Sequence, residues 1–339
     1  MTALMIGLTG STLAEVDVEA LRHPAVAGAI LFARNFVDAA QLAALCAAIR
    51  AAAPGALIAV DQEGGRVQRL RGGFTELPPL QRIGSLHAHH PAAARRAARL
   101  HAEIMATEVL AAGLDLSFAP VADLARGNLA IGDRAFDAAP EACAELAAVY
   151  ADTMQRVGMA ATLKHFPGHG SVVADTHHDR AIDTRSAATI FDADLLPFAT
   201  GVLAGARAVM MAHVEYPAVA DEAAGYSRWW IEGLLRGALG FRGVVISDDI
   251  GMVAGAALGD VAARLAAHRD AGCDLILVCD PGLVATALDA APALKLRATP
   301  RLARQLRGRL PAAQRRARES STWGQRAARL AALLESQDP

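Results

Sequence analysis

Eight short apolar segments recur along the chain, and each is followed by a longer, alanine-rich segment whose apolar residues have helical spacing. This alternation predicts parallel strands that are joined by right-handed helical crossovers. Eight such units favour a closed (β/α)8 barrel of the TIM type, and an open doubly wound sheet is the alternative. No Gly-x-Gly-x-x-Gly follows a strand, which weakens the dinucleotide-binding version of that alternative. The predicted strands are Ala3–Leu8, Ala29–Phe32, Leu57–Val60, Leu116–Ala119, Ala161–Lys164, Ala208–Ala212, Val244–Ser247 and Leu275–Val278.

The segments between these strands predict amphipathic helices. Several of them end at a glycine, which is the usual residue just beyond a helix C-terminus. An arginine-rich segment, Pro300–Glu335, follows the last strand, and we expect terminal helices whose solvated faces carry the arginines; an interaction surface is the alternative. We therefore predict one domain over residues 1–339, with the barrel at about 3–292 and C-terminal helices at about 300–335. The clearest predicted helices are Ala40–Ala52, Arg95–Ala111, Glu141–Val157, Leu195–Leu203, Trp229–Leu239 and Val261–Ala271.

Composition excludes several classes of protein. The net charge is -2, from 33 basic and 35 acidic residues, which argues against a protein that holds nucleic acid. No segment reaches the roughly 18 uncharged apolar residues of a membrane span, and the N-terminus lacks the basic region of a secretory signal. The four cysteines show no close metal-type spacing, so we expect free thiols and a cytoplasmic protein.

Charged or imidazole residues lie at or just beyond the C-terminal ends of five of the predicted strands. In a (β/α)8 barrel the C-terminal ends of the strands form one rim, where the active site lies. The residues are Asp61 to Arg69 after the third strand, Asp123 after the fourth, Lys164 to Gly170 after the fifth, His213 after the sixth, and Asp248 with Asp249 after the seventh. Their shared position at one rim predicts a catalytic site.

Each of these residues also has a structural interpretation. Asp61 is able to cap a helix N-terminus, and His213 to be a core histidine bonded to a backbone carbonyl. We expect Asp249 to cap the next helix while Asp248 points into the barrel mouth. Arg69 and Arg134 could be ordinary surface arginines, although each lies in a loop rich in polar groups.

The loop after the fifth strand is dense in ionisable groups. It contains His165, His169, Asp175, His177, His178 and Asp179. Metal binding is one interpretation, but Pro167 and Gly168 disfavour the helix that would bring two of these histidines to one ion. Proton transfer is the favoured one, because Asp175 and His177 share a face of an extended segment and the carboxylate there orients the ring. We expect a mobile loop that closes over substrate.

Five segments together resemble glycoside hydrolase family 3. Their closest likeness is to its single-domain bacterial branch, the cytoplasmic β-N-acetylhexosaminidases of cell-wall recycling. The resemblance extends from about Met5 to the end of the barrel, and the run at 164–170 is its most specific part. The segments are Asp-Gln-Glu-Gly-Gly-Arg-Val-Gln-Arg (61–69), Ile-Gly-Asp-Arg (131–134), Lys-His-Phe-Pro-Gly-His-Gly (164–170), Ala-Asp-Thr-His (174–177) and Gly-Phe-Arg-Gly-Val-Val-Ile-Ser-Asp-Asp (240–249).

The resemblance implies a role for each matched residue. Asp248 would be the catalytic nucleophile, His177 the general acid/base and Asp175 its partner. An additional imidazole, His178, directly follows the acid/base. The residues implied to bind the sugar are Asp61, Arg69, Arg134, Lys164 and His165.

The implied activity is that of a retaining hydrolase that needs no metal or cofactor. It would release terminal β-linked N-acetylglucosamine (GlcNAc) from peptidoglycan fragments. The partner would be a small disaccharide or muropeptide, GlcNAc linked to 1,6-anhydro-N-acetylmuramic acid (anhydroMurNAc) with or without peptide, and the enzyme a monomer. A β-N-acetylglucosaminide phosphorylase is the alternative, followed by a metal-dependent hydrolase that uses the histidine-rich loop and by a catalytically silent sugar-binding protein.

Overall fold

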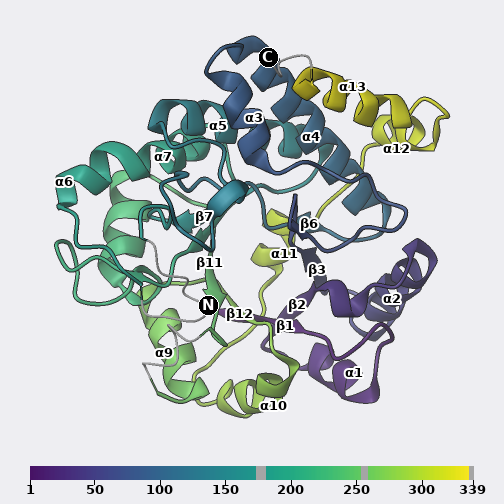
Figure 1. The fold of residues 1–339 in the computed structure, drawn as a ribbon. Coiled ribbons are helices and arrows are strands. Elements are labelled where there is room, and N and C mark those ends of the chain that lie inside the picture. Colours follow the sequence, from purple (N-terminus) through teal and green to yellow (C-terminus); the bar gives the residue numbers. More distant parts are fainter. Residues whose placement is uncertain (173–180, 253–258, 336–339) are drawn as a thin grey trace.

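The computed structural model describes residues 1–172, 181–252 and 259–335, and within them the main sheet has eight strands (Figure 1). All neighbouring strands pair in parallel, in the order β6-β3-β2-β1-β12-β11-β9-β7. The strands are β1 (Ala3–Gly7), β2 (Val26–Leu31), β3 (Leu57–Val60), β6 (Leu116–Ser117), β7 (Thr162–Phe166), β9 (Ala208–Met211), β11 (Val244–Asp249) and β12 (Leu275–Val278).

The two end strands of this sheet meet and bring the barrel close to full closure. Val121, just beyond β6, forms a parallel bridge with Lys164 of β7. On either side of that bridge, the Ala122 N–H donates to the Lys164 carbonyl at 2.7 Å and the Thr162 N–H donates to the Ala119 carbonyl at 2.8 Å. The predicted (β/α)8 barrel is therefore confirmed, and the open sheet is excluded.

Predicted and observed strands differ mainly at their ends. β2 begins three residues before the predicted Ala29 and includes Gly28, which pattern reading treats as a break. A glycine is needed there because a Cβ would lie 2.0 Å from the Leu57 carbonyl oxygen of the neighbouring strand. β7 and β11 each continue two residues beyond the prediction, so that the polar rim residues are the last residues of these strands.

Helices surround the sheet on its outer side (Figure 1). Helices α7 and α9 have the predicted bounds, and the predicted helix at 229–239 is a π-helical segment, η5. Gly158 and Gly272 end α5 and α9 with φ angles of 100° and 111°, as a left-handed C-terminal cap requires. The longer helices are α1 (Glu15–Arg22), α2 (Ala39–Ala52), α3 (Leu80–His87), α4 (Pro91–Ala111), α5 (Pro140–Val157), α7 (Leu195–Leu203), η5 (Trp229–Ala238), α9 (Val261–Ala271) and α10 (Pro281–Ala290).

The arginine-rich C-terminal segment forms the expected helices, α11 (Pro300–Leu306), α12 (Ala312–Glu319) and α13 (Gly324–Glu335). Trp323 is buried there, and its Nε1–H donates to Glu108 of α4 at 2.9 Å. Arg307 donates to the Asp115 carboxylate next to β6, at 3.2 Å. These contacts show that part of the segment's positive charge is paired with the barrel.

Two further observations concern the whole described chain. None of its helices has both the length and the apolar character that crossing a membrane requires. All four cysteines are free thiols, and Cys46, Cys143 and Cys273 are buried. These thiols match the sequence-based expectation.

Candidate active site

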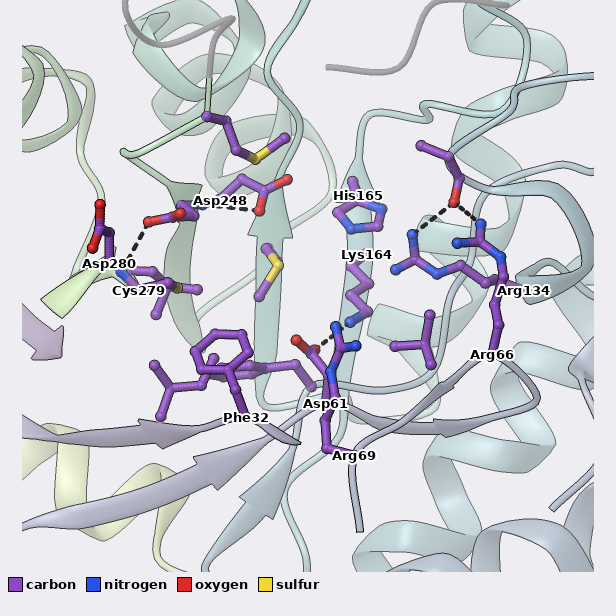
Figure 2. A pocket seen from close by; sticks show the side chains of 18 of the residues that line it. Phe32, Asp61, Arg66, Arg69, Arg134, Lys164, His165, Asp248, Cys279 and Asp280 are labelled. Atoms are coloured by element: carbon purple, nitrogen blue, oxygen red, sulfur yellow. Dashed lines mark hydrogen bonds and ion pairs between the residues drawn. The ribbon is translucent and has the colours of Figure 1, made fainter. Parts of the chain in front are cut away.

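A cavity of about 710 Å³ opens at the C-terminal ends of the barrel strands. It contains every predicted site residue that the structure describes, and Figure 2 shows them around one space. The polar lining residues are Arg34, Asp61, Arg66, Arg69, Arg134, Lys164, His165, Asp248, Asp249 and Asp280. The main apolar lining residues are Phe32, Phe118, Met210, Met252 and Leu277. A cavity with many charged groups and some apolar surface is suited to a ligand that carries many hydroxyl groups.

One wall of the cavity is a buried network of two carboxylates and two cations. Lys164 of β7 is buried, and its Nζ lies 2.8 Å from Asp61 Oδ1 and 2.5 Å from Glu63 Oε1. Arg134, on the turn η2 (Gly132–Arg134), donates from Nε and Nη2 to the two oxygens of Glu63, both at 2.8 Å. Such a two-pronged pair holds the guanidinium in one plane and one orientation.

The charges of this network stabilise one another against burial. Burial by itself would raise the pKa of Glu63, but Arg134 and Lys164 lower it to well below its ordinary range. Burial would likewise lower the pKa of Lys164, but Asp61 and Glu63 raise it above its ordinary value. Glu63, Lys164 and Arg134 therefore carry full charges near neutral pH.

His165, the residue after Lys164, has a fixed orientation. Its Nδ1 lies 2.8 Å from Asp123 Oδ2, and its backbone N–H donates to the same carboxylate. Burial would raise the pKa of Asp123, but His165 lowers it below the ordinary value, so the carboxylate is ionised and acts only as an acceptor. The Nδ1 atom must therefore carry the hydrogen, which leaves Nε2 for a ligand.

Asp248 and Asp249 end strand β11, and both line the cavity. The Asp249 N–H donates to Asp248 Oδ1 at 2.9 Å, and the Asp249 side chain accepts the Cys279 N–H at 2.9 Å. Burial raises the pKa of Asp249 above its ordinary value. Asp260 caps α9, the next helix that the structure describes. Residues 253–258, which follow Asp249 more closely, lie outside the described residues, so the predicted cap role of Asp249 stays a prediction. Asp249 joins β11 to the end of β12.

Three other sequence interpretations can be settled. His213 is a core histidine, because it is buried and its Nε2 lies 3.2 Å from the Asp249 carbonyl oxygen. Arg134 is not an ordinary surface arginine, since it is held in the buried network. Arg69 is half-buried, and its guanidinium carbon lies 5.9 Å from the centre of the Phe32 ring on the cavity wall.

Sequence reasoning missed two residues of this site. Glu63 was part of a recognised motif, and Asp123 was recognised as a strand-end residue, but neither received a role. Glu63 follows Asp61 by two positions in extended backbone, and this spacing, which paired Asp175 with His177, could have placed it beside Asp61. The chain carries no comparable signal that Asp123 contacts His165.

The predicted acid/base pair, Asp175 and His177, lies outside the described residues, as do His178, Asp179 and the loop expected to close over substrate. Across the described ranges, no group of three histidine, cysteine, aspartate or glutamate side chains is arranged to hold a metal ion. The imidazole of His165 is instead bonded to Asp123.

Comparisons with known proteins identify the family. The sequence model described as "Glycosyl hydrolase family 3 N terminal domain" matches residues 4–304. A protein named Beta-hexosaminidase from Xanthomonas axonopodis pv. citri is 58% identical over 288 residues, which are 85% of this chain and 86% of that protein. A protein of the same name from Stenotrophomonas maltophilia is 59% identical over 288 residues, again 85% of this chain and 86% of its own length.

Solved structures of similar fold point to the same family as these relatives. Native NagZ from Neisseria gonorrhoeae superposes with a TM-score of 0.89 at 38% identity, over 100% of this chain and 98% of that one. The same protein in complex with N-trifluoroacetyl-D-glucosamine gives a TM-score of 0.89 at 38% identity, over 98% of each chain. The predicted class of enzyme, a glycosidase, is confirmed. The chain therefore belongs to glycosyl hydrolase family 3.

Proposed function

We propose that this β-hexosaminidase is a retaining hydrolase that releases terminal β-linked GlcNAc from peptidoglycan fragments. Its substrate is GlcNAc linked to anhydroMurNAc, with or without peptide. The observation that carries the proposal is the placement of Asp248 at the end of β11, in the same cavity as the hydroxyl-binding groups Asp61, Lys164 and His165. The names of the relatives and the glucosamine derivative in the neisserial structure support the choice of sugar.

The reaction has two displacements at C1 of the sugar. Asp248 attacks C1 and forms a glycosyl ester, while the C1–O bond to the aglycone breaks and His177 donates a proton to the departing oxygen. His177, now neutral, then takes a proton from water as the water oxygen attacks C1 and expels Asp248. Two inversions give net retention of the β-configuration.

The buried network suits the sugar-binding role. Lys164 and Arg134 supply donors and Asp61 supplies an acceptor, all held by ion pairs that exist without ligand. His165 presents Nε2 because Asp123 holds Nδ1. Fixed donors and acceptors lower the entropic cost of orienting a pyranose over the nucleophile.

The assignment of His177 and Asp175 as acid/base pair rests on the sequence. We expect His177→Ala to lower kcat much less for an aryl glycoside with an activated leaving group than for the disaccharide, since a good leaving group needs little protonation. Comparing kcat/KM for the two substrates measures the difference. Equal losses on both substrates would make His177 a structural residue.

Trapping the intermediate tests the proposal directly. A slow 5-fluoro GlcNAc donor should form a covalent adduct, and peptide mapping should place the added mass on Asp248. A label on any other residue would overturn the assignment of the nucleophile.

Two other reactions are distinguished by simple controls. A histidine acid/base carries no negative charge to repel phosphate, so products are compared with and without phosphate; hydrolysis predicts free GlcNAc, and the 1-phosphate as main product would indicate a phosphorylase. Activity lost with a chelator and restored by zinc would indicate a metal-dependent hydrolase.

We also propose that the enzyme is a cytoplasmic monomer. Its four free thiols are suited to a reducing compartment.

A further inference from the structure

Asp249 is held at three of its groups, and each contact reaches a different part of the barrel. Its N–H donates to Asp248 Oδ1 at 2.9 Å. Its carbonyl oxygen lies 3.2 Å from Nε2 of His213, two residues beyond the end of β9. Its carboxylate accepts the Cys279 N–H, just after β12, at 2.9 Å. The carbonyl and the carboxylate of Asp249 are therefore held by residues that follow the neighbouring strands, and its N–H is directed to Asp248 on its own strand.

His213 lies beneath the end of β11 and belongs to a buried cluster of rings. The ring centres of His213 and Tyr226 are 5.3 Å apart, and those of His213 and His268 are 5.4 Å apart. Burial lowers the pKa of His213 below its ordinary value, although the charges of Asp248 and Asp249 act in the opposite direction. The neutral ring has one N–H, which must lie on Nε2 because only an N–H can donate to the Asp249 carbonyl.

The other nitrogen of His213 gives a reason to assign a role to this bond. Nδ1 is buried, and no hydrogen-bond partner for it is found among the residues that the structure describes. A buried polar atom without a partner costs free energy that an apolar side chain of similar size would avoid. Local costs of this kind are expected where a residue serves function as well as packing.

We infer that His213 is a positioning residue for the nucleophile: its Nε2–H holds the carbonyl of Asp249, and the backbone of Asp249, held in this way, directs its own N–H to Oδ1 of Asp248 and keeps that carboxylate in one orientation toward C1. The inference rests on the proposed function, in which Asp248 attacks the sugar. The hydrogen bond of His213 reaches Asp249 and not a residue proposed to bind the sugar. Its loss should therefore slow formation of the glycosyl ester without weakening sugar binding.

The experiment compares substitutions of two histidines from the same ring cluster. His213→Leu removes the donor and keeps most of the volume, whereas His213→Gln places an amide N–H near the position of Nε2. His268→Leu is the matched control, because His268 is equally buried but contacts the Gly225 carbonyl, at 2.9 Å, instead of the nucleophile strand. The readouts are the burst of aryl leaving group and the rate of trapping by the 5-fluoro donor.

We expect His213→Leu to lower the rate constants of the burst and of trapping about 100-fold, which is the effect of misplacing a reacting group by about 1 Å. The substrate concentration that gives half of the maximal burst rate should change by no more than about threefold. His213→Gln should recover most of the lost rate, and His268→Leu should stay within a few-fold of the native enzyme. If His213→Leu does not fold, His213→Asn takes its place, because its shorter side chain cannot bring an N–H to the Asp249 carbonyl.

Several outcomes would overturn the inference. They are trapping of His213→Leu at the native rate, equal slowing in His213→Leu and His268→Leu, or no recovery with His213→Gln. A label that maps away from Asp248 in the native enzyme would instead contradict the proposed function, so the two failures are distinguishable.

Discussion

Replacing Asp248 with alanine is expected to lower kcat by about 10⁴-fold or more while binding of GlcNAc stays measurable. The carboxylate is the nucleophile of the proposed mechanism, so the variant cannot form the glycosyl ester. A water molecule in its place is a much weaker nucleophile toward C1. The groups proposed to bind the sugar come from other segments of the barrel, around Asp61, Arg134 and Lys164, and remain in place. Turnover of a chromogenic β-glycoside and calorimetric titration with GlcNAc measure the two effects separately.

Azide provides a second measurement on Asp248→Ala. A small anion fits into the space of the missing carboxylate and can attack C1 directly, so it should restore turnover of an activated aryl glycoside. The product should be the α-glycosyl azide, because a single displacement inverts the configuration.

The neighbouring carboxylate is the control for this prediction. Asp249→Asn keeps the size of the side chain and an oxygen that accepts the Cys279 N–H. We expect it to lose activity by about tenfold at most, since the two peptide contacts of Asp249 remain. If Asp249→Asn were inactive and Asp248→Ala active, Asp249 and not Asp248 would be the nucleophile.

Replacing Glu63 with glutamine is expected to lower the free energy of unfolding by about 3 kcal/mol near neutral pH. Glu63 is buried and accepts from Arg134 and Lys164, so the neutral amide removes the anion that both buried cations contact. Removing one partner of a buried ion pair typically costs about 3–5 kcal/mol. Urea unfolding at pH 7 measures the change.

The pH dependence of stability gives an independent test of Glu63. Its pKa in the folded chain lies below the unfolded value of about 4.3, so its contribution is complete above that pH and is lost as the pH falls toward the folded value. The native enzyme should therefore lose stability in acid more steeply than Glu63→Gln. Parallel acid profiles for the two proteins would show that Glu63 is not held as an anion.

Glu145→Gln is the matched control for Glu63→Gln. Glu145 also has two basic partners, His87 at 2.7 Å and Arg95 at 2.6 Å, but its side chain is 37% exposed. Exposed pairs contribute about 1 kcal/mol or less, because water screens the charges. An equal or larger loss with Glu145→Gln would contradict the explanation based on burial.

Much of the fold followed from the sequence because the (β/α)8 pattern is local. The eight strands alternate with helices, and two of the strands, β3 and β12, have the predicted bounds. In a parallel barrel every strand presents its C-terminal end to the same rim, so residues after strands could be assigned to one site without knowledge of their contacts. Family motifs then added the chemistry and the nucleophile.

Tertiary structure decided which of these residues are partners. Lys164 meets Asp61 across 103 residues of chain, Arg134 meets Glu63 across 71, and His165 meets Asp123 across 42. It also showed that Asp249 lies at the junction of β11 with β12, where His213 contacts its carbonyl oxygen.

The sequence by itself determined that Asp248 lies at the rim of a (β/α)8 barrel among basic and acidic groups. This was possible because the two-residue period of a strand and the helical crossover between parallel strands are both set by residues close together in the chain. What only the tertiary structure decided is which charges neutralise one another and which atoms face the cavity. Those pairings depend on how closed the barrel is and on where each strand ends, and no spacing along the chain encodes the distance between side chains from different strands.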